Sequence, residues 1–157
     1  MEEPGSWRMN LGETDFDSPA GEEYSPVALD HAQNPRWNGR LSHYHGRARL
    51  TGSCGESMEM FIFLRAGMVE YASFITDGCG ASHACGSMTV CLARGKPLWE
   101  VLALEQQDII EALEGLPAGH EHCAGLAVAT LRAACEDGLH GGELRALESD
   151  IQDDEIE

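Results

Sequence analysis

The sequence predicts an α+β domain in which a three-stranded antiparallel sheet packs against a layer of helices. Apolar and polar residues alternate between residues 40 and 76, whereas apolar residues recur at helical spacing after residue 79. Strands followed by helices are typical of a two-layer α+β fold. A chain of 157 residues, 43% of them hydrophobic, is long enough for one such domain with a single core.

A short helix is expected to open the folded part of the chain. Ser25 suits the N-cap position, Pro26 suits the first helical position, and Asn34-Pro35 ends the helix. An antiparallel meander should follow, because the short connection at residues 65–68 contains glycine, as a hairpin requires. We expect its strands at residues 41–51, 57–65 and 68–75.

The remainder of the chain is expected to be helical. The first of these helices should end at Gly95, since glycine favours helix C-termini. We expect helices at residues 80–94, from residue 98 or shortly after, at 107–113 and at 121–135.

Acidic residues are concentrated at both ends of the chain, whose net charge is -17. Residues 1–23 and 143–157 each carry seven acids and one base, so residues 24–142 have a net charge of only -5. We therefore expect an acidic flexible N-terminal arm at 1–23, the folded domain at 24–142, and an acidic C-terminal tail at 143–157. So acidic a chain would be repelled by nucleic acids and anionic membranes, and neither is an expected partner.

The first residues of the chain lack the basic and apolar regions of a secretory signal. No apolar run approaches the ~20 residues that a membrane-spanning helix needs. We therefore expect a cytoplasmic location, where the six cysteines would remain reduced. They would then serve as ligands, nucleophiles or core residues.

Three cysteines lie in glycine-rich or polar segments and are the candidate ligands of a functional site. Cys54 falls in a predicted turn, Cys79 at the start of a predicted helix, and Cys123 in the first turn of another. Helix N-termini offer free N–H groups and a positive dipole, which favour thiolates. Glu56 and His122 lie beside the first and third cysteine, and either could be a fourth ligand. Three thiolates with one oxygen or nitrogen donor suit an iron–sulfur cluster or zinc.

The other cysteines are expected to be core thiols. Cys79, Cys85 and Cys91 are six residues apart, so each step turns a helix by ~600° and the thiols point about 120° apart. They cannot share one ligand face. We expect Cys85, Cys91 and Cys135 to be small buried residues.

Three histidines near these cysteines are also candidate ligands. His83 lies one turn after Cys79 and could contact its thiolate, although a partly buried polar helix residue is the simpler interpretation. His120 and His122 flank Glu121, and only one of them is expected to face the site of Cys123.

Short motifs in a specific order extend from about residue 24 to residue 134. They are Tyr24-Ser25, Asp30-His31, Asn34-Pro35-Arg36, Cys54-Gly55, Gly78-Cys79-Gly80, Gly95-Lys96, Leu116-Pro117 and His122-Cys123-Ala124. In these motifs the chain resembles the NifU/IscU family of iron–sulfur cluster assembly scaffolds. The resemblance implies a SufE/NifU-like two-layer fold and a carrier protein that is not an enzyme. Such a scaffold assembles a transient [2Fe-2S] cluster from iron and desulfurase-derived sulfur and transfers it to apo-proteins.

The resemblance also implies which residues bind the cluster. Cys54, Cys79 and Cys123 correspond to the cluster thiolates, His122 to the histidine before the third cysteine, and Glu56 to the acid after the first. The same five residues are the expected metal ligands if iron or zinc occupies the site. The implied partners are a cysteine desulfurase and apo iron–sulfur proteins, and the scaffold would be a monomer or a cluster-linked dimer.

The chain departs from the family pattern at two places. The family usually has aspartate where this chain has Glu56. Many bacterial members have Leu-Pro-Pro-Val-Lys, read by a dedicated Hsp70 chaperone, where this chain has Leu116-Pro117-Ala118-Gly119-His120. The sequence therefore leaves open whether a chaperone pair is a partner.

Two other functions compete with the scaffold. One is a zinc-bound sulfurtransferase of the SufU type, an enzyme that accepts persulfide sulfur from a desulfurase. The other is a structural zinc domain, which usually has closed, local ligand pairs. The SufU branch typically carries an insertion before the third cysteine and lacks the preceding histidine, so the short interval and His122 favour the scaffold.

Overall fold

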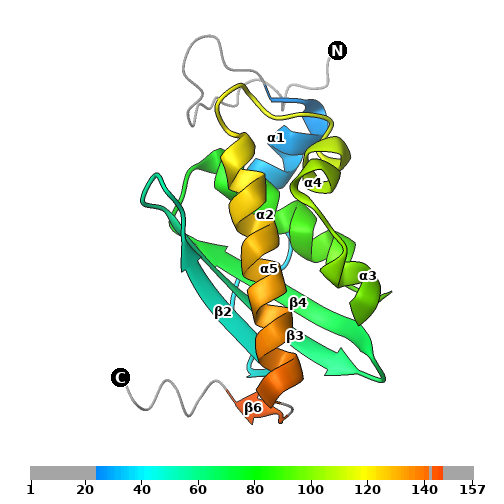
Figure 1. Cartoon of the computed structure of the whole chain (residues 1–157). Helices are drawn as coiled ribbons and strands as arrows, with labels where there is room; N and C mark the ends of the chain where they lie inside the picture. The colour runs from blue at the N-terminus through cyan, green and yellow to red at the C-terminus, as the bar shows by residue number, and fades with distance from the viewer. Residues whose placement is uncertain (1–23, 142, 147–157) are drawn as a thin grey trace.

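The computed structural model describes residues 24–141 and 143–146, which form a sheet with a layer of helices over one face (Figure 1). The α+β class and the antiparallel pairing predicted from the sequence are confirmed. The predicted number of strands is wrong, because the main sheet has four strands in the order β2-β3-β4-β5. These strands are β2 (Gly46–Thr51), β3 (Ser57–Arg65), β4 (Met68–Thr76) and β5 (Lys96–Pro97).

The two unpredicted features of the sheet involve strands of only two residues. β5 pairs with the start of β4, where Pro97 lies opposite Met68 at the edge of the sheet. The first predicted strand is divided, so that β1 (His43–Tyr44) leaves the main sheet and pairs with β6 (Arg145–Ala146). Such short strands have no sequence periodicity of their own, since tertiary contacts determine their pairing.

The predicted helices are present, although the bounds of three of them differ from expectation, those of α2 by a single residue. Ser25 caps the first helix, and its Oγ accepts a hydrogen bond from the Ala28 N–H at 2.9 Å. The last helix continues well past the predicted end at residue 135, and the one before it begins one residue early. The helices are α1 (Pro26–Gln33), α2 (Gly80–Ala93), α3 (Leu98–Leu102), α4 (Gln106–Ala112) and α5 (Glu121–Gly141).

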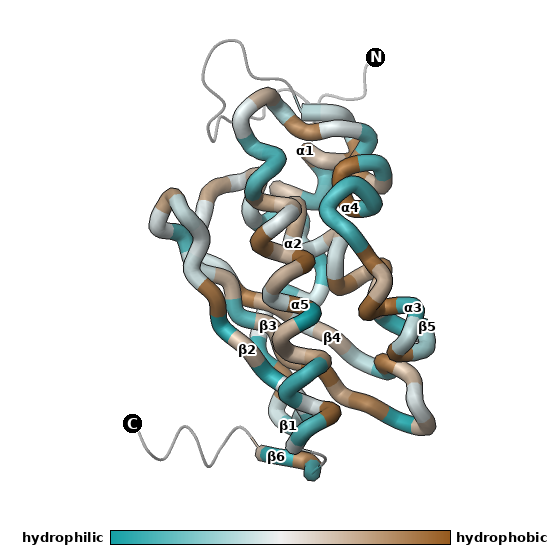
Figure 2. Tube along the Cα trace, viewed as in Figure 1, coloured by the Kyte–Doolittle hydropathy of each residue, from teal (hydrophilic) through white to brown (hydrophobic). Residues whose placement is uncertain are grey.

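The core lies between the sheet and the helices. β3 is one of the two inner strands, and Met58, Met60 and Ile62 on it are fully buried. Figure 2 shows hydrophobic stretches along β3, β4 and the helices that lie against them. The hairpin between β3 and β4 turns at Ala66 and Gly67, both with positive φ, as the glycine in this connection predicted. No helix in residues 24–141 or 143–146 is long and apolar enough to cross a membrane.

Helix α5 lies directly on strand β2 at one glycine. A Cβ atom on Gly46 would be 2.1 Å from the Ala134 carbonyl oxygen and 2.7 Å from the Gly138 nitrogen. Both are backbone atoms of α5, so they cannot turn away as a side chain could. Gly46 therefore sets how closely the second half of α5 approaches the sheet.

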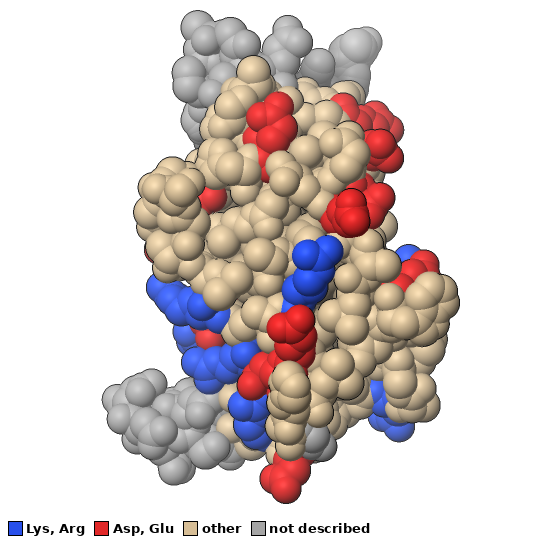
Figure 3. All heavy atoms as spheres, in the orientation of Figure 1, with Lys and Arg blue, Asp and Glu red and all other residues tan. Residues whose placement is uncertain are grey.

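Basic residues of this acidic chain gather over β2 (Figure 3). Arg40, Arg47, Arg49 and Arg145 line one concave region there. Within it the Arg47 Nε atom lies 2.9 Å from a carboxylate oxygen of the buried Glu59. This pairing gives the buried carboxylate an opposite charge, as a buried acid requires.

The predicted terminal segments are mostly outside the described residues. The arm at 1–23 and residues 147–157 of the tail cannot be compared with the structure. Residues 145–146, also within the predicted tail, form β6 and pair with β1.

Candidate metal and cluster site

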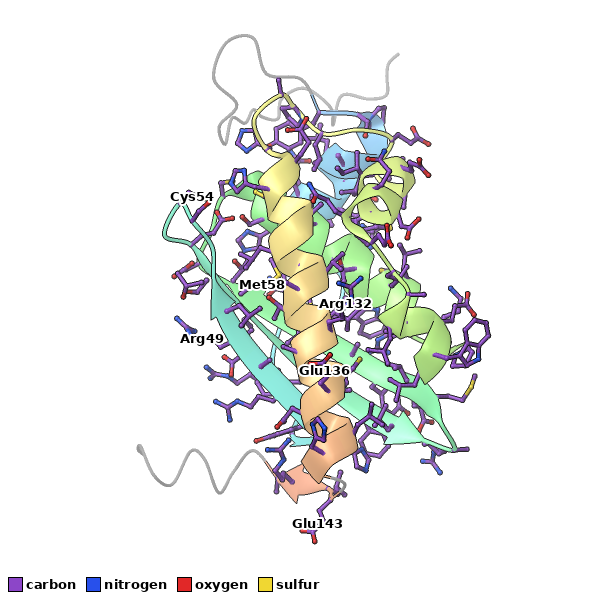
Figure 4. The ribbon with its side chains drawn as sticks, in the orientation of Figure 1. Arg49, Cys54, Met58, Arg132, Glu136 and Glu143 are labelled. Atoms are coloured by element: carbon purple, nitrogen blue, oxygen red, sulfur yellow. The ribbon has the colours of Figure 1, made fainter. Side chains whose placement is uncertain are left out.

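Three segments that are far apart in the sequence meet at one end of the sheet. They are the turn between β2 and β3, the N-terminus of α2 and the N-terminus of α5 (Figure 4). Each carries one of the three cysteines singled out from the sequence, in the turn, at the helix start and in the first helical turn that were predicted for them. Only the folded domain brings these thiols together.

The turn that carries Cys54 is fixed by backbone hydrogen bonds. The Gly52 N–H donates to the Glu56 carbonyl at 2.7 Å, and the Gly55 N–H donates to the Gly52 carbonyl at 3.0 Å. Gly55 has φ +91°, which favours glycine. The turn leaves Cys54 exposed, whereas the side chain of Glu56 points inward and is only 10% exposed.

The approach to Cys79 also depends on a glycine. A Cβ atom on Gly78 would be 2.4 Å from Ser82 Oγ and 2.9 Å from Glu56 Oε1. The missing side chain thus leaves room for the Glu56 carboxylate beside the start of α2. Cys79 is the N-cap residue of α2, with extended backbone dihedrals.

The donors predicted from the sequence lie close together. Cys54 Sγ is 3.1 Å from His122 Nε2, and Cys123 Sγ is 3.7 Å from the same nitrogen. Glu56 Oε2 is 3.6 Å from Cys123 Sγ and 3.9 Å from His122 Nε2. Ligands of a tetrahedral zinc ion, with bonds of about 2.0–2.3 Å, are themselves about 3.3–3.8 Å apart. The separations therefore fit metal coordination.

These donors fall into two groups, in each of which all ligand atoms lie within 4.8 Å of one another. Cys54, Glu56 and His122 form one group, and Cys79, His120 and Cys123 form the other. The expectation that only one of the two histidines faces the site is wrong. The loop before α5 carries His120 to the side of Cys79, and the first turn of α5 carries His122 to the side of Cys54.

Two cysteines of the site, Cys79 and Cys123, have pKa values shifted in opposite directions. The Cys123 thiol donates a hydrogen bond to Cys79. This hydrogen bond, together with those from the backbone N–H groups of Ser82 and Ala81, lowers the pKa of Cys79 to about 4. The same donated hydrogen bond and burial raise the pKa of Cys123. Without a metal, Cys79 is therefore the thiolate of the pair and Cys123 the thiol.

Ser82 adds a polar contact that the sequence analysis missed. Its buried hydroxyl donates to Cys123 Sγ at 3.6 Å and lies 3.9 Å from Cys79 Sγ. The signal was available, because Ser82 follows Cys79 by three residues and so lies one turn further along the same helix face.

The remaining cysteines belong to neither donor group. Cys85 and Cys135 are fully buried, as predicted, and Cys91 is only half-buried. Burial raises the pKa of Cys135 to about 12. His83 is also half-buried and belongs to neither group, with its Nδ1 atom 3.0 Å from the Cys79 carbonyl oxygen.

Comparison with known proteins gives consistent relatives. Residues 23–139 match the family described as NifU-like N terminal domain. An iron-sulfur cluster assembly scaffold protein IscU of Archaeoglobus fulgidus is 36% identical over 115 residues, which are 73% of this chain and 75% of that protein. The protein named iron-sulfur cluster assembly scaffold protein IscU in Escherichia coli K12 is 35% identical over 119 residues, covering 73% of this chain and 92% of its own length.

Two solved structures share the fold. A nitrogen-fixing NifU-like protein (N-terminal) from Brucella abortus has a TM-score of 0.60 at 15% identity, covering 74% of this chain and 94% of its own. A putative iron-sulfur cluster assembly scaffold protein for the SUF system from Fervidobacterium islandicum has a TM-score of 0.59 at 18% identity, covering 71% and 96%. Together with the sequence matches, these findings show that the chain belongs to the NifU-like N-terminal domain family.

Proposed function

We propose that this chain is a scaffold on which a [2Fe-2S] cluster is assembled from iron and sulfur and from which it passes to apo-proteins. The observation that carries the proposal is the meeting of Cys54, Cys79 and Cys123 with Glu56 and His122 at one end of the sheet. Thiolates are the usual ligands of iron–sulfur clusters, and histidine replaces thiolate in some of them. The two curated relatives above carry scaffold names, which supports the same function.

The exposure of the site suits a cluster that must leave again. Cys54 and Cys79 are exposed, so a cysteine desulfurase could deliver sulfur to them and an acceptor thiol could reach the cluster. Glu56 and His122 are poorer matches to iron among thiolates than a fourth cysteine would be. A mixed donor set open to solvent favours transient binding over permanent storage.

Cys79 is well suited to receive sulfur. Its lowered pKa, which reflects the hydrogen bond from Cys123, makes it a thiolate at neutral pH, and the thiolate is the nucleophilic form of cysteine. The desulfurase would carry out the covalent chemistry on free cysteine. The scaffold would supply donors, and in this function it is not an enzyme.

Anaerobic reconstitution tests the proposal. The apo-protein is incubated with ferrous iron, cysteine, a cysteine desulfurase and dithiothreitol, which reduces the delivered sulfur to sulfide. We expect visible absorption typical of a [2Fe-2S] cluster, and equal amounts of iron and acid-labile sulfide after desalting. Desalted protein that contains zinc or iron but no sulfide would contradict the scaffold function.

A zinc-bound sulfur acceptor of the SufU type is the second candidate, because the separations between the donor atoms also fit tetrahedral zinc. The two candidates differ in what forms on this chain while the desulfurase turns over. The sulfur acceptor would retain zinc during turnover and raise the rate of alanine formation, without forming a cluster. A purely structural zinc domain is disfavoured by the exposure of Cys54 and Cys79, since structural sites are closed.

A further inference from the structure

We propose that His120 is a metal ligand of this chain, and that with it the site binds two divalent cations instead of one. Cys79, His120 and Cys123 would bind one ion, and Cys54, Glu56 and His122 the other. This inference rests on the proposed function, since the two ions would be the irons of the future cluster. It adds a ligand that the family motifs do not contain, because many members have lysine at this position.

The loop before α5 fixes the position of His120. The His120 N–H donates to the Pro117 carbonyl at 3.1 Å, and the His120 carbonyl accepts from the Cys123 N–H at 3.1 Å. The Gly119 N–H donates to a carboxylate oxygen of Glu121 at 3.2 Å. The backbone around His120 is thus tied to the first turn of α5, so the ligand atoms of His120 and Cys123 are presented together.

The two histidines lie close together but belong to different donor groups. Their rings are nearly parallel, 22° apart in orientation, with centroids separated by 6.4 Å. Two imidazole ligands of one tetrahedral ion, each bonded through nitrogen at about 2.0 Å, would have ring centroids about 5 Å apart. The observed separation of 6.4 Å therefore suits two neighbouring ions better than one. His122 Nε2 lies 3.1 Å from Cys54 Sγ, whereas His120 groups with Cys79 and Cys123.

The number of donors exceeds what a single ion uses. Zinc in proteins is almost always four-coordinate, whereas the site offers six donor residues in its two groups. Cys123 connects the groups, because its Sγ atom also lies 3.6 Å from Glu56 Oε2 and 3.7 Å from His122 Nε2. A shared thiolate in this position could bridge two ions.

Charge supports the same number of ions. When metal binds, ligand cysteines are deprotonated, so the three thiolates and the Glu56 carboxylate carry four negative charges. Two divalent cations balance them, whereas one would leave two negative charges at a site where Cys123 is buried and the Glu56 side chain is only 10% exposed. Uncompensated charge that is withdrawn from water is unfavourable.

Titration of the reduced apo-protein with Co²⁺ under anaerobic conditions tests this inference. Thiolate-to-cobalt charge-transfer absorption counts only ions bound to sulfur, so ions on surface carboxylates do not contribute. We expect saturation at two Co²⁺ per chain in the parent and at one in His120→Ala. His140→Ala is the matched control, because His140 is an exposed histidine in the last turn of α5, far along the helix from the site, and this variant should still bind two.

Two further variants separate loss of a ligand from loss of fold. His120→Cys should again bind two Co²⁺, with stronger charge-transfer absorption. His120→Lys, which introduces the residue many relatives have, should fold with parent-like far-ultraviolet circular dichroism and bind one. Saturation of the parent at one Co²⁺, or of folded His120→Lys at two, would overturn the inference. Neither result bears on the scaffold function, which fails only if reconstitution of the parent gives no cluster.

Discussion

Reconstitution of Cys79→Ser is expected to give less than about a tenth of the cluster that the parent chain forms. We expect the same of Cys54→Ser and Cys123→Ser. A serine hydroxyl stays protonated at neutral pH and is a hard donor, so iron would lose a thiolate that the remaining ligands cannot replace. Cys79 should show the largest loss, because it is also the thiolate that the hydrogen bond from Cys123 stabilises.

The control for this prediction is Cys91→Ser. Cys91 lies on the same helix as Cys79 but belongs to neither donor group and is half-buried. We expect its cluster yield, measured by iron and sulfide content, to match that of the parent. A normal yield from any of the three ligand variants would remove that cysteine from the site.

Gly46→Ala is expected to lower the free energy of unfolding by about 3 kcal/mol, the upper part of the range for overpacked cores. The added methyl group would lie 2.1 Å from the Ala134 carbonyl oxygen, and backbone atoms of α5 must move to admit it. Because α5 also carries Cys123, the displaced helix should weaken metal binding as well. Urea unfolding followed by circular dichroism measures the first effect.

Gly39→Ala is the matched substitution for Gly46→Ala. A Cβ atom on Gly39 would have no other atom within 4 Å, so we expect a change of no more than about 0.5 kcal/mol. If the two variants unfold at the same urea concentration, α5 does not pack on β2 at Gly46 as described.

The sequence was sufficient for most of the fold because its signals are local. The Ser25-Pro26 pair predicted the start of α1, and the alternation from residue 57 predicted β3 and β4 with nearly their observed ends. The glycine at residue 67 predicted the hairpin between them. In each case the residues that determine the element lie within it or at its ends.

The elements that the sequence missed depend on distant partners. β5 exists because Lys96 and Pro97 lie against Met68 and Val69, and nothing in two residues reveals that pairing. β6 likewise forms against β1, about a hundred residues earlier in the chain. Such contacts are known only once the fold is known.

In the candidate site, too, the local features could be predicted and the distant contacts could not. Residue types and helix positions were enough to single out the cysteines, but not to say which donors lie near each other. His120 was expected to face away when His122 faced the site, since the two are separated by one residue. The structure places His120 in the loop before α5 and His122 within the helix, so helical spacing does not relate them.

The measurement that tests the central claim most directly is transfer of the cluster to an apo-ferredoxin. The reconstituted chain is desalted and mixed with the apo-ferredoxin under anaerobic conditions, and the circular dichroism of the holo-ferredoxin is followed in the visible range. A scaffold is expected to produce the full holo-ferredoxin signal, at a higher rate than the same amounts of free iron and sulfide in the presence of a chelator. A cluster that stays on this chain, or a transfer that the chelator abolishes, would contradict the account.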